Sequence, residues 1–315
     1  MNKFLTGLLI IGAITIIVGG GLIGVGCATS NGGAYETNEY KLDEAFEKIN
    51  IDVETASVEI KASTDGQNKV VCYEKEDRKH TVKVADNKLS ITYVNNLPWY
   101  KKIFNFSIKG PQITIYLADT KYDTLVGKIN TGSYTINAGF TFGSMDLKSD
   151  TGSITVNSYS ESFIKAETDT GNIKLNNVKA KNLDLESDTG SIDINNSIIE
   201  ENIEAETDTG HINFESVKCN DVNANDSTGS IKFNNTIVIN KITAKTSTGS
   251  IKFDKSDANT LSLKASTGSI TGTLLSNKIF YCSSDTGRVN VPSSTDGGLC
   301  EAETDTGSIN LSIVQ

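Results

Sequence analysis

Histidine and proline are scarce in this chain, which has 2 and 3 of them among its 315 residues. Because proline cannot donate to a sheet ladder, its scarcity beside 27 glycines fits a chain of many strands and tight turns. His80 and His211 stand alone in the sequence, so we expect neither to be a metal ligand or a catalytic base. We therefore predict an all-β protein that binds no metal and no cofactor.

Cysteine pairs at metal-binding spacing are also lacking, because none of the 5 cysteines belongs to a Cys-x-x-Cys motif. Cys282 and Cys300 precede two of the repeated glycines described below by five and seven residues, on predicted inward positions, and could approach each other. Buried free thiols are the expected state, since disulfide geometry is demanding, but the sequence leaves a bond between them open.

An excess of positive charge is lacking too. The net charge is −10, and residues 131–315 carry 24 acidic against 14 basic side chains. Binding to nucleic acid depends on a basic surface, so nucleic acid is excluded as the partner of this part of the chain.

A short phrase, typically Asp/Ser-Thr-Gly-Ser-Ile, recurs from residue 131 onwards. Its glycines follow one another at intervals of 19 or 20 residues, which is too short for a helical hairpin repeat and indicates a stack of structural units. These turn glycines are Gly132, Gly152, Gly171, Gly190, Gly210, Gly229, Gly249, Gly268, Gly287 and Gly307.

The residues on both sides of each glycine alternate between apolar and polar. Ile242 and Ala244 before Gly249, and Ile251 and Phe253 after it, alternate with polar residues, as in half-buried strands. Asn pairs mark the opposite corner of each unit, because Asn and Gly tolerate a left-handed backbone. We predict a β-solenoid of short 19–20-residue two-strand coils over residues 131–315. Stacked about 4.8 Å apart, such coils would form a rod on the order of 50 Å long.

Residues 4–26 contain no charged side chain and follow Lys3, so this segment could span a bilayer with the rest of the chain outside the cytoplasm. We assign residues 1–28 to a membrane anchor or signal segment and favour a retained transmembrane helix. The sequence from Ile23 to Cys27 resembles a bacterial lipobox, which makes lipidation of Cys27 one alternative and secretion after cleavage another. All three place the β domain at the bacterial cell surface.

Residues 29–45 have the composition of a polar linker, and residues 46–130 are expected to form an irregular β section that caps the solenoid. This section holds the only aromatic cluster. Trp99, Tyr100 and Phe104 lie beside lysines, as is typical of a contact with a lipid surface or a protein partner. Closure of the open end of the solenoid is the alternative role of these aromatic residues.

The apolar N-terminal segment, the strand-rich section and the Thr-Gly-Ser-Ile repeats together resemble the bacterial "putative adhesin" family. This is a β-strand-repeat domain of unknown function in envelope proteins of Firmicutes. The resemblance covers roughly residues 46–312 and rests on the phrases Asp150 to Ile154, Asp188 to Ile192, Ser247 to Ile251 and Asp305 to Ile309. It implies a surface protein, in some members an accessory of envelope-stress operons, and offers no catalytic residue.

Asp-Thr-Gly-Ser is also the active-site phrase of aspartic proteases. That activity is rejected, because the copies stack in one column and because Ser227, Ser247 and Ser266 replace the aspartate. The remaining aspartates should stack about 5 Å apart as a solvated acidic edge. Calcium binding there is the alternative, although the glycine-rich calcium repeat is lacking. These aspartates are Asp150, Asp169, Asp188 and Asp208.

We therefore expect a noncatalytic, membrane-anchored envelope protein that presents an extended repeat surface for adhesion or for partner binding related to envelope stress. The partner would be an envelope protein or a wall polymer. A self-assembling structural protein is the alternative, because an uncapped last coil from Ser308 to Val314 would offer free strand edges for homo-oligomers through the solenoid ends. A polysaccharide-active β-helix enzyme is a remote alternative.

Overall fold

The computed structural model describes residues 16–17, 35–76, 78–93 and 110–314, and over these residues every regular element is a β-strand. No helix in this part of the chain is long and apolar enough to cross a membrane. Of the predicted membrane segment, only Ile16 and Ile17 are described. They form β1 (Ile16–Ile17), which pairs antiparallel with β2 (Tyr35–Leu42).

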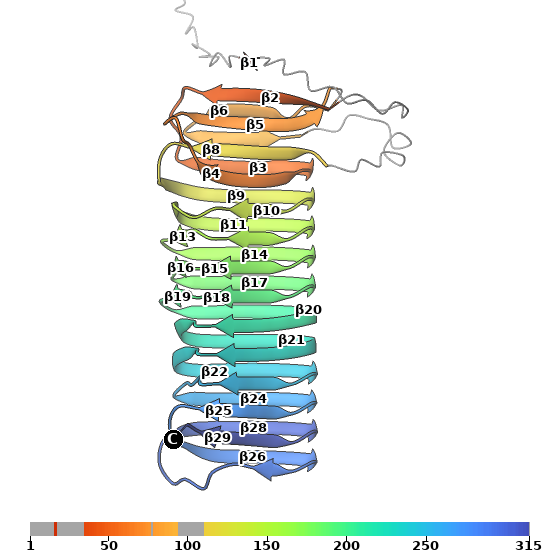
Figure 1. Ribbon diagram of the computed structural model, residues 1–315, viewed down its shortest axis with the longest axis vertical. Coiled ribbons are helices and arrows are strands. Elements are labelled where there is room, and N and C mark those ends of the chain that lie inside the picture. Colours follow the sequence, from red (N-terminus) through yellow and green to blue (C-terminus); the bar gives the residue numbers. More distant parts are fainter. Residues whose placement is uncertain (1–15, 18–34, 77, 94–109, 315) are drawn as a thin grey trace, which may run out of the picture.

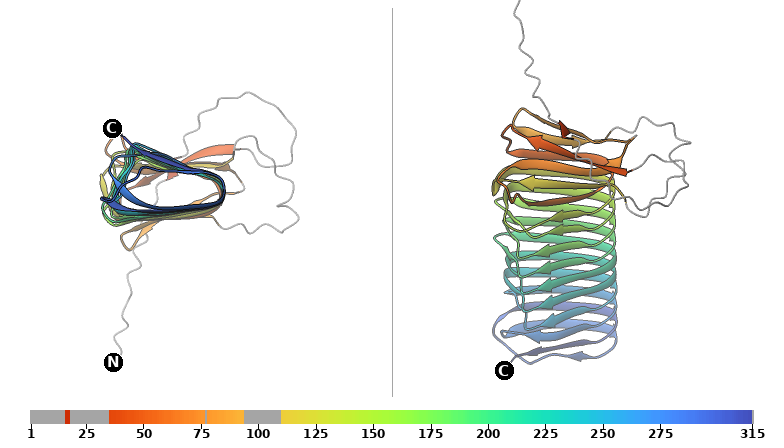
Figure 2. Two further views of the ribbon diagram at one scale, coloured as in Figure 1. Left: turned by 90° about the horizontal axis from the view of Figure 1, so that it is seen from below. Right: turned by 45° about the horizontal axis from the view of Figure 1, so that its top comes forward.

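The repeats form a rod of stacked coils, which confirms the predicted all-β solenoid (Figure 1). Each coil runs along one face, turns at its glycine and returns along the other face, so that the coils superpose in a flattened outline when viewed along the rod (Figure 2). The coils that contain a turn glycine are built from β9 (Lys121–Thr131), β10 (Tyr134–Ile136), β11 (Thr141–Thr151), β12 (Ile154–Val156), β14 (Phe163–Thr170), β15 (Ile173–Asn176), β17 (Asn182–Thr189), β18 (Ile192–Asn195), β20 (Asn202–Glu215), β21 (Lys218–Asn234), β22 (Ile237–Thr248), β23 (Ile251–Asp254), β24 (Thr260–Thr267), β25 (Ile270–Leu274), β26 (Lys278–Thr286), β27 (Val289–Asn290), β28 (Gly298–Thr306) and β29 (Ile309–Ile313).

Successive coils pair parallel and in register, so equivalent residues stack on one another. Ile173 lies opposite Ile192, and Thr170 opposite Thr189. The inward positions fill a continuous apolar core in which Phe214, Phe233 and Phe253 stack with ring centroids 4.7 and 4.9 Å apart. The rod is stabilised because the inward apolar side chains of each coil are buried against those of the adjacent coils, which a single coil could not provide.

The glycine corner requires glycine for a steric reason. Gly190 has a φ of 151°, and a Cβ added there would lie 1.8 Å from the carbonyl oxygen of Gly171 in the preceding coil. At the opposite corner, Asn177 and Asn196 adopt φ values of 54° and 50°, in the left-handed region that asparagine tolerates.

Several coils have a third side, which the two-strand prediction missed. Short strands follow the Asn corner and pair parallel with their neighbours, because the chain there remains extended for two residues before it turns into the next long strand. These short strands are β13 (Tyr159–Ser160), β16 (Lys179–Ala180) and β19 (Ile198–Ile199).

The chain before residue 121 adds two further coils and an antiparallel cover. β3 and β4 stack parallel on β9 and β10, and β7 and β8 stack parallel on the far side of β3 and β4. β2, β5 and β6 pair antiparallel at this end of the rod. The bounds of these strands are β3 (Lys48–Thr55), β4 (Ser57–Ala62), β5 (Asn68–Lys75), β6 (Thr81–Ala85), β7 (Lys88–Thr92) and β8 (Gln112–Leu117).

At the other end the order of the coils departs from the order of the sequence. The coil of β28 and β29 pairs with β24 and β25 on one side and with β26 and β27 on the other. Figure 1 accordingly places the C-terminus beside β28 and β29, with β26 beyond them at the end of the rod. The expectation that Ser308 to Val314 forms an uncapped last coil was wrong, because β26 and β27 lie beyond this coil and Ile309 and Asn310 also pair with β27.

Candidate functional site

The glycine corner carries a straight column of exposed threonines. Each threonine immediately precedes a turn glycine and stands in register with the threonine of the adjacent coil, and Thr55 extends the column onto β3. The stacking brings identical hydroxyl and methyl groups to the surface at the coil spacing of about 4.8 Å. The other members are Thr131, Thr151, Thr170, Thr189, Thr209, Thr228, Thr248, Thr267, Thr286 and Thr306.

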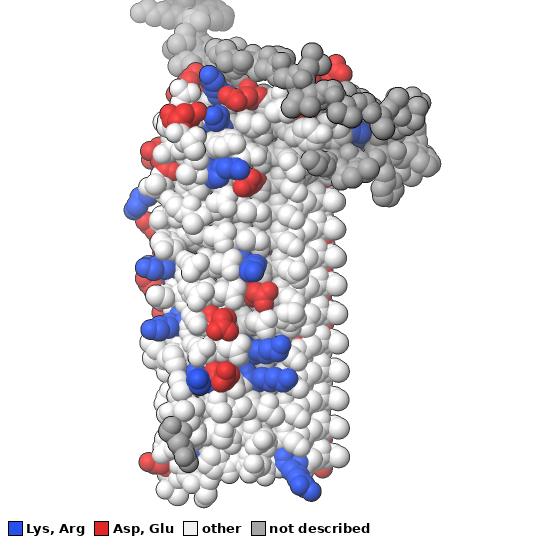
Figure 3. All heavy atoms as spheres, in the orientation of Figure 1, with Lys and Arg blue, Asp and Glu red and all other residues white. Residues whose placement is uncertain are grey.

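The threonine column was not predicted from the sequence, although the threonine of each repeated phrase is the signal for it. Figure 3 shows a regular row of uncharged residues along the edge where the long strands end, while most charged side chains in this view lie over the middle of the face and along the opposite edge. The row is linear and repetitive, and its own side chains are uncharged.

The predicted aspartate column lies beside the threonines, with Asp169, Asp188 and Asp208 exposed. Ser227 interrupts the column and donates a hydrogen bond to Asp208 Oδ1 at 3.2 Å. Lysines neutralise part of the neighbouring acidic surface, for example through the 3.0 Å ion pair between Lys165 Nζ and Asp184 Oδ2. The geometry is that of a solvated acidic edge.

Glu186 stands beside this column on β17. Burial raises its pKa, and the negative charges of Glu167, Asp188 and Glu206 add to the effect. The negative side chains of the acidic edge therefore repel one another. They do not converge on one point, as a catalytic pair or a metal site would require.

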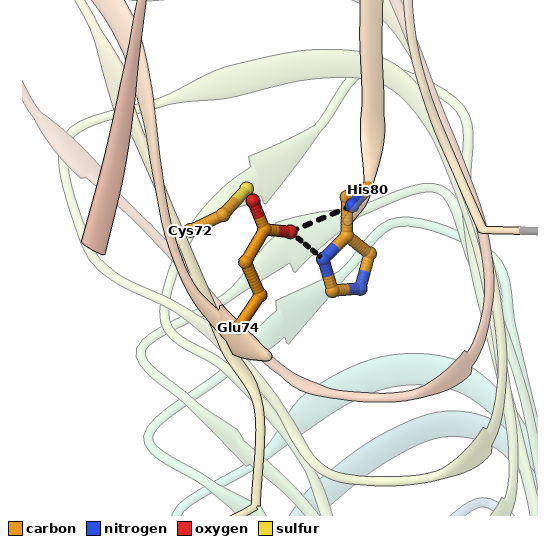
Figure 4. A group of neighbouring side chains, drawn as sticks. All are labelled: Cys72, Glu74 and His80. Carbon is orange, nitrogen blue, oxygen red and sulfur yellow. Dashed lines mark hydrogen bonds and ion pairs between the residues drawn. The ribbon is translucent and has the colours of Figure 1, made fainter. Parts of the chain in front are cut away.

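A buried polar cluster lies near the N-terminal end of the rod, where Cys72, Glu74 and His80 come together (Figure 4). His80 was expected to be isolated, and this was wrong. Its Nδ1 lies 2.7 Å from Glu74 Oε2, and the two side chains are 3% and 0% exposed. The sequence held a signal: Val70, Cys72 and Glu74 occupy successive inward positions of β5, so a buried carboxylate needed a partner.

The Glu74 carboxylate is surrounded by donors. Oε2 also accepts the His80 backbone N–H at 2.6 Å, and Oε1 accepts bonds from Asn38 Nδ2 at 2.8 Å and Tyr40 Oη at 3.3 Å. Burial alone would raise the pKa of Glu74, but the bonds from His80 and Asn38 outweigh it and lower the pKa.

The cluster has the thiol, carboxylate and imidazole donors of a zinc site, and its ligand atoms lie within 4.8 Å of one another. However, both carboxylate oxygens of Glu74 already accept hydrogen bonds. The pKa of the Cys72 thiol is raised by burial and by the charge of Glu74. Because the side chains are also closed off from solvent, the arrangement is that of a satisfied structural network.

The remaining predicted residues fall into three groups. Cys27, Trp99, Tyr100 and Phe104 lie outside the described residues. Cys282 and Cys300 are unbonded, on neighbouring coils, with the Cys300 thiol donating toward Cys282 and lowering the pKa of the latter. His211 stands at a glycine corner, where its Nδ1 lies 2.9 Å from Ser191 Oγ.

Comparison with known proteins gives one family. A family model described as Toastrack DUF4097 matches residues 46–213 and 197–315. No curated protein matches the chain.

Solved structures with a similar chain course include a "putative adhesin" from Bacteroides fragilis, at 15% identity over 89% of this chain and 97% of that protein, with a TM-score of 0.40. A "putative lipid binding protein" from Parabacteroides distasonis shows 13% identity over 90% and 98%, with a TM-score of 0.33. A "putative cell adhesion protein" from Clostridium sporogenes shows 11% identity over 89% and 100%, with a TM-score of 0.22.

Proposed function

The chain belongs to the Toastrack DUF4097 family, which confirms the resemblance drawn from its repeats, and from this premise we propose a noncatalytic protein of the bacterial cell surface. In this proposal residues 4–26 anchor the chain in the membrane, and the rod projects outside the cytoplasm. Its extended surface binds an envelope protein or a wall polymer, in adhesion or in partner binding related to envelope stress.

The threonine column is the observation that carries this proposal. Binding sites for small substrates are concave, whereas the column is a straight edge that repeats one chemical group at each coil. A linear array of weak, identical contacts suits a partner that is itself extended and repetitive, because many contacts form together once the first ones are made.

The pockets beside the strands also fit a binding role. Three pockets on the described surface have volumes of about 270, 160 and 70 Å³. Asp184, Glu186, Glu204 and Glu206 around the smallest one belong to the repeated acidic surface, with no convergent nucleophile or base beside them among the described residues. A polysaccharide-active enzyme therefore remains the remote alternative.

The test is capture by residues 35–315, used as bait against solubilised envelope proteins and against purified wall polymer. A variant with Thr189→Lys and Thr228→Lys places two bulky charges on the threonine column. The matched control, Ile198→Lys and Ile237→Lys, places the same charges at exposed positions of the opposite corner, where these side chains are 49% and 38% exposed.

We expect specific capture that the threonine variant reduces at least tenfold and that the control leaves intact. A Trp99→Ala/Phe104→Ala variant tests the aromatic segment in parallel. Equal capture by both lysine variants would remove the column from the interaction. Failure of the unmodified bait to capture anything would count against partner binding as a whole.

Self-assembly is the second candidate function. β26 and β27 each pair with one strand only within the described part of the chain, so each leaves a free edge at the end of the rod. Free edges of this kind are templates for pairing with another chain. Fibres or dimers of the bait that increase with concentration would favour this candidate.

A further inference from the structure

Residues 298–313 occupy a slot between two coils that precede them in the sequence. On one side Leu261 pairs with Cys300 and Ile270 with Ile309; on the other, Phe280 pairs with Cys300. This coil is therefore held by a ladder of backbone hydrogen bonds on both of its edges, although only one of its two neighbours is adjacent in the chain.

The inward side chains of this coil are covered on both sides. Cys300, Ala302, Ile309 and Leu311 are at most 3% exposed and fill the core continuously. In the end coil the equivalent inward residues are less covered: Phe280 and Cys282 are partly buried, and Val289 is 42% exposed. The inserted coil thus gains burial of its inward face on both sides, and the end coil on one side only.

Hydrogen bonds at the glycine corner join the inserted coil to both neighbours as well. Thr304 Oγ1 donates to the carbonyl oxygen of Gly268 at 2.8 Å, and Ser284 Oγ of the end coil donates to that of Gly307 at 2.8 Å. The slot is therefore complementary to this segment in register, in core side chains and in polar contacts.

We propose that residues 298–313 are an exchangeable coil, and that the slot of one chain accepts the same residues of a second copy. Two chains then pair by reciprocal exchange, each donating its coil to the other. Every contact of the slot is kept, so exchange costs little beyond the loss of freedom on association, as in other swapped dimers.

The connection is long enough for exchange. Residues 291–297 link the end coil to the inserted coil, and seven residues span at most about 25 Å when extended. Two rods that meet end to end bring their slots within about three coil spacings, roughly 15 Å. The coil leaves its slot when its pairing with β26 and β27 on one side and with β24 and β25 on the other is broken.

Exchange requires no external partner, so it stands or falls separately from the proposed adhesion. It also differs from pairing of free edges, in which β26 of one copy would meet β26 of another. In an exchanged dimer, β28 of one copy lies beside β26 of the other, and Tyr281 and Glu301 form a directly opposite and exposed pair across this junction.

The experiment uses two differently tagged full-length chains in mild detergent, both with Cys282→Ser. One carries Tyr281→Cys and the other Glu301→Cys. They are mixed at increasing concentration, with and without a brief exposure to sub-denaturing urea, and then oxidised. A parallel mixture pairs Tyr281→Cys with Lys245→Cys, an exposed position on β22 that is distant in the stack from residue 281. A single chain with both Tyr281→Cys and Glu301→Cys shows whether the junction can be bridged at all.

We expect the chain with both substitutions to close an internal bridge, and the 281/301 mixture to give at least tenfold more doubly tagged dimer than the 281/245 mixture. The urea pulse should increase that yield. If the internal bridge forms while the two mixtures cross-link equally, exchange is refuted. Dimers joined through residue 281 of both copies would instead indicate pairing of free edges, which also refutes it. Failure of the internal bridge would overturn the arrangement of β26 and β28 on which the inference rests.

Discussion

A column of buried hydroxyl groups runs inside the rod, three residues before the turn glycines. In most coils a Ser or Thr at this position donates to the carbonyl oxygen of the glycine in the adjacent coil, as Thr207 Oγ1 does to Gly190 at 2.9 Å. The same bond is made by Ser149, Thr168, Ser187, Thr246, Ser284 and Thr304. These bonds tie successive corners together within the core.

Asp226 takes the hydroxyl's place in one coil, where it is 3% exposed and neither carboxylate oxygen has a well-formed hydrogen bond. Burial raises its pKa from 3.8 to about 6, and the backbone N–H of Thr228 opposes this only in part. The folded state thus binds the proton more tightly than the unfolded state. Its stability falls as the pH rises from about 4 to about 6 and then stays lower by about 3 kcal/mol.

We predict that Asp226→Thr stabilises the protein at pH 7, by about 1–3 kcal/mol, because it removes a buried charge and supplies the missing hydroxyl. Denaturant unfolding at pH 7 and pH 4 measures this, and the gain should shrink at pH 4, where Asp226 is protonated in the folded state. Asp208→Thr, at an exposed position, is the control and should change little. A gain that is equal at both pH values would contradict the role given to the charge.

A second prediction concerns the buried cluster of Cys72, Glu74 and His80. Glu74→Gln should destabilise the protein by about 2–4 kcal/mol at pH 7, because the amide cannot accept all the bonds of the carboxylate. Since the folded pKa of Glu74 is lowered, its contribution is present above the unfolded value near 4.5 and is lost as the pH falls below it. The two proteins should therefore become closer in stability in acid, and a difference that grows on acidification would argue against a charged Glu74.

At the scale of the elements, the ion pair between Lys278, the first residue of β26, and Asp257 fixes the end of the rod. Lys278 Nζ lies 2.8 Å from Asp257 Oδ1, with side chains 1% and 11% exposed. Asp257 also accepts bonds from the backbone N–H of Leu275 and the hydroxyl of Ser276. These contacts hold the chain where it passes the inserted coil to reach the end position.

Replacing Lys278 by Met should cost about 3 kcal/mol locally, because it leaves the Asp257 charge without its cation. Hydrogen exchange should accelerate in β26–β29 and remain unchanged in the central coils. Lys264→Met is a matched control, since Lys264 makes a surface pair with Glu303 at 3.3 Å and about half of each side chain is exposed. Faster exchange throughout the rod would mean that the ends and the centre unfold as one unit.

The strands and the glycine corner were predictable because alternation and a constant interval leave little choice of face or period. The order of the coils was not. Every repeat offers the same Thr-Gly corner and the same inward pattern, so the sequence from residue 259 to 314 is compatible with either order of the last two coils. The order becomes visible only in the pairing, where β28 and β29 rather than β26 and β27 lie beside β24 and β25. The Glu74–His80 pair escaped because it lies in the antiparallel cover, where no repeat applies.

The whole molecule behaves as a one-dimensional array, since each coil contacts only its neighbours and equivalent residues stack in register. A complete coil is then a removable unit. Deletion of residues 172–190 joins Gly171 directly to Ser191 and places Ile154 opposite Ile192, in the same register that Ile154 has with Ile173. The core, the threonine column and both ends of the rod are kept.

We predict that this deletion folds cooperatively, with a rod about 5 Å shorter by solution scattering and only a modestly lower midpoint of thermal unfolding. Deletion of residues 172–181 is the control, because the loss of about half a coil moves the Thr189–Gly190 corner to the place of Lys179–Ala180, so that the glycine corners no longer stack in one column. This control should be insoluble or unfold without cooperativity. If both deletions behaved alike, the coils would not be the independent units that their pairing implies, and the stability of the rod would have to come from contacts that extend beyond neighbouring coils.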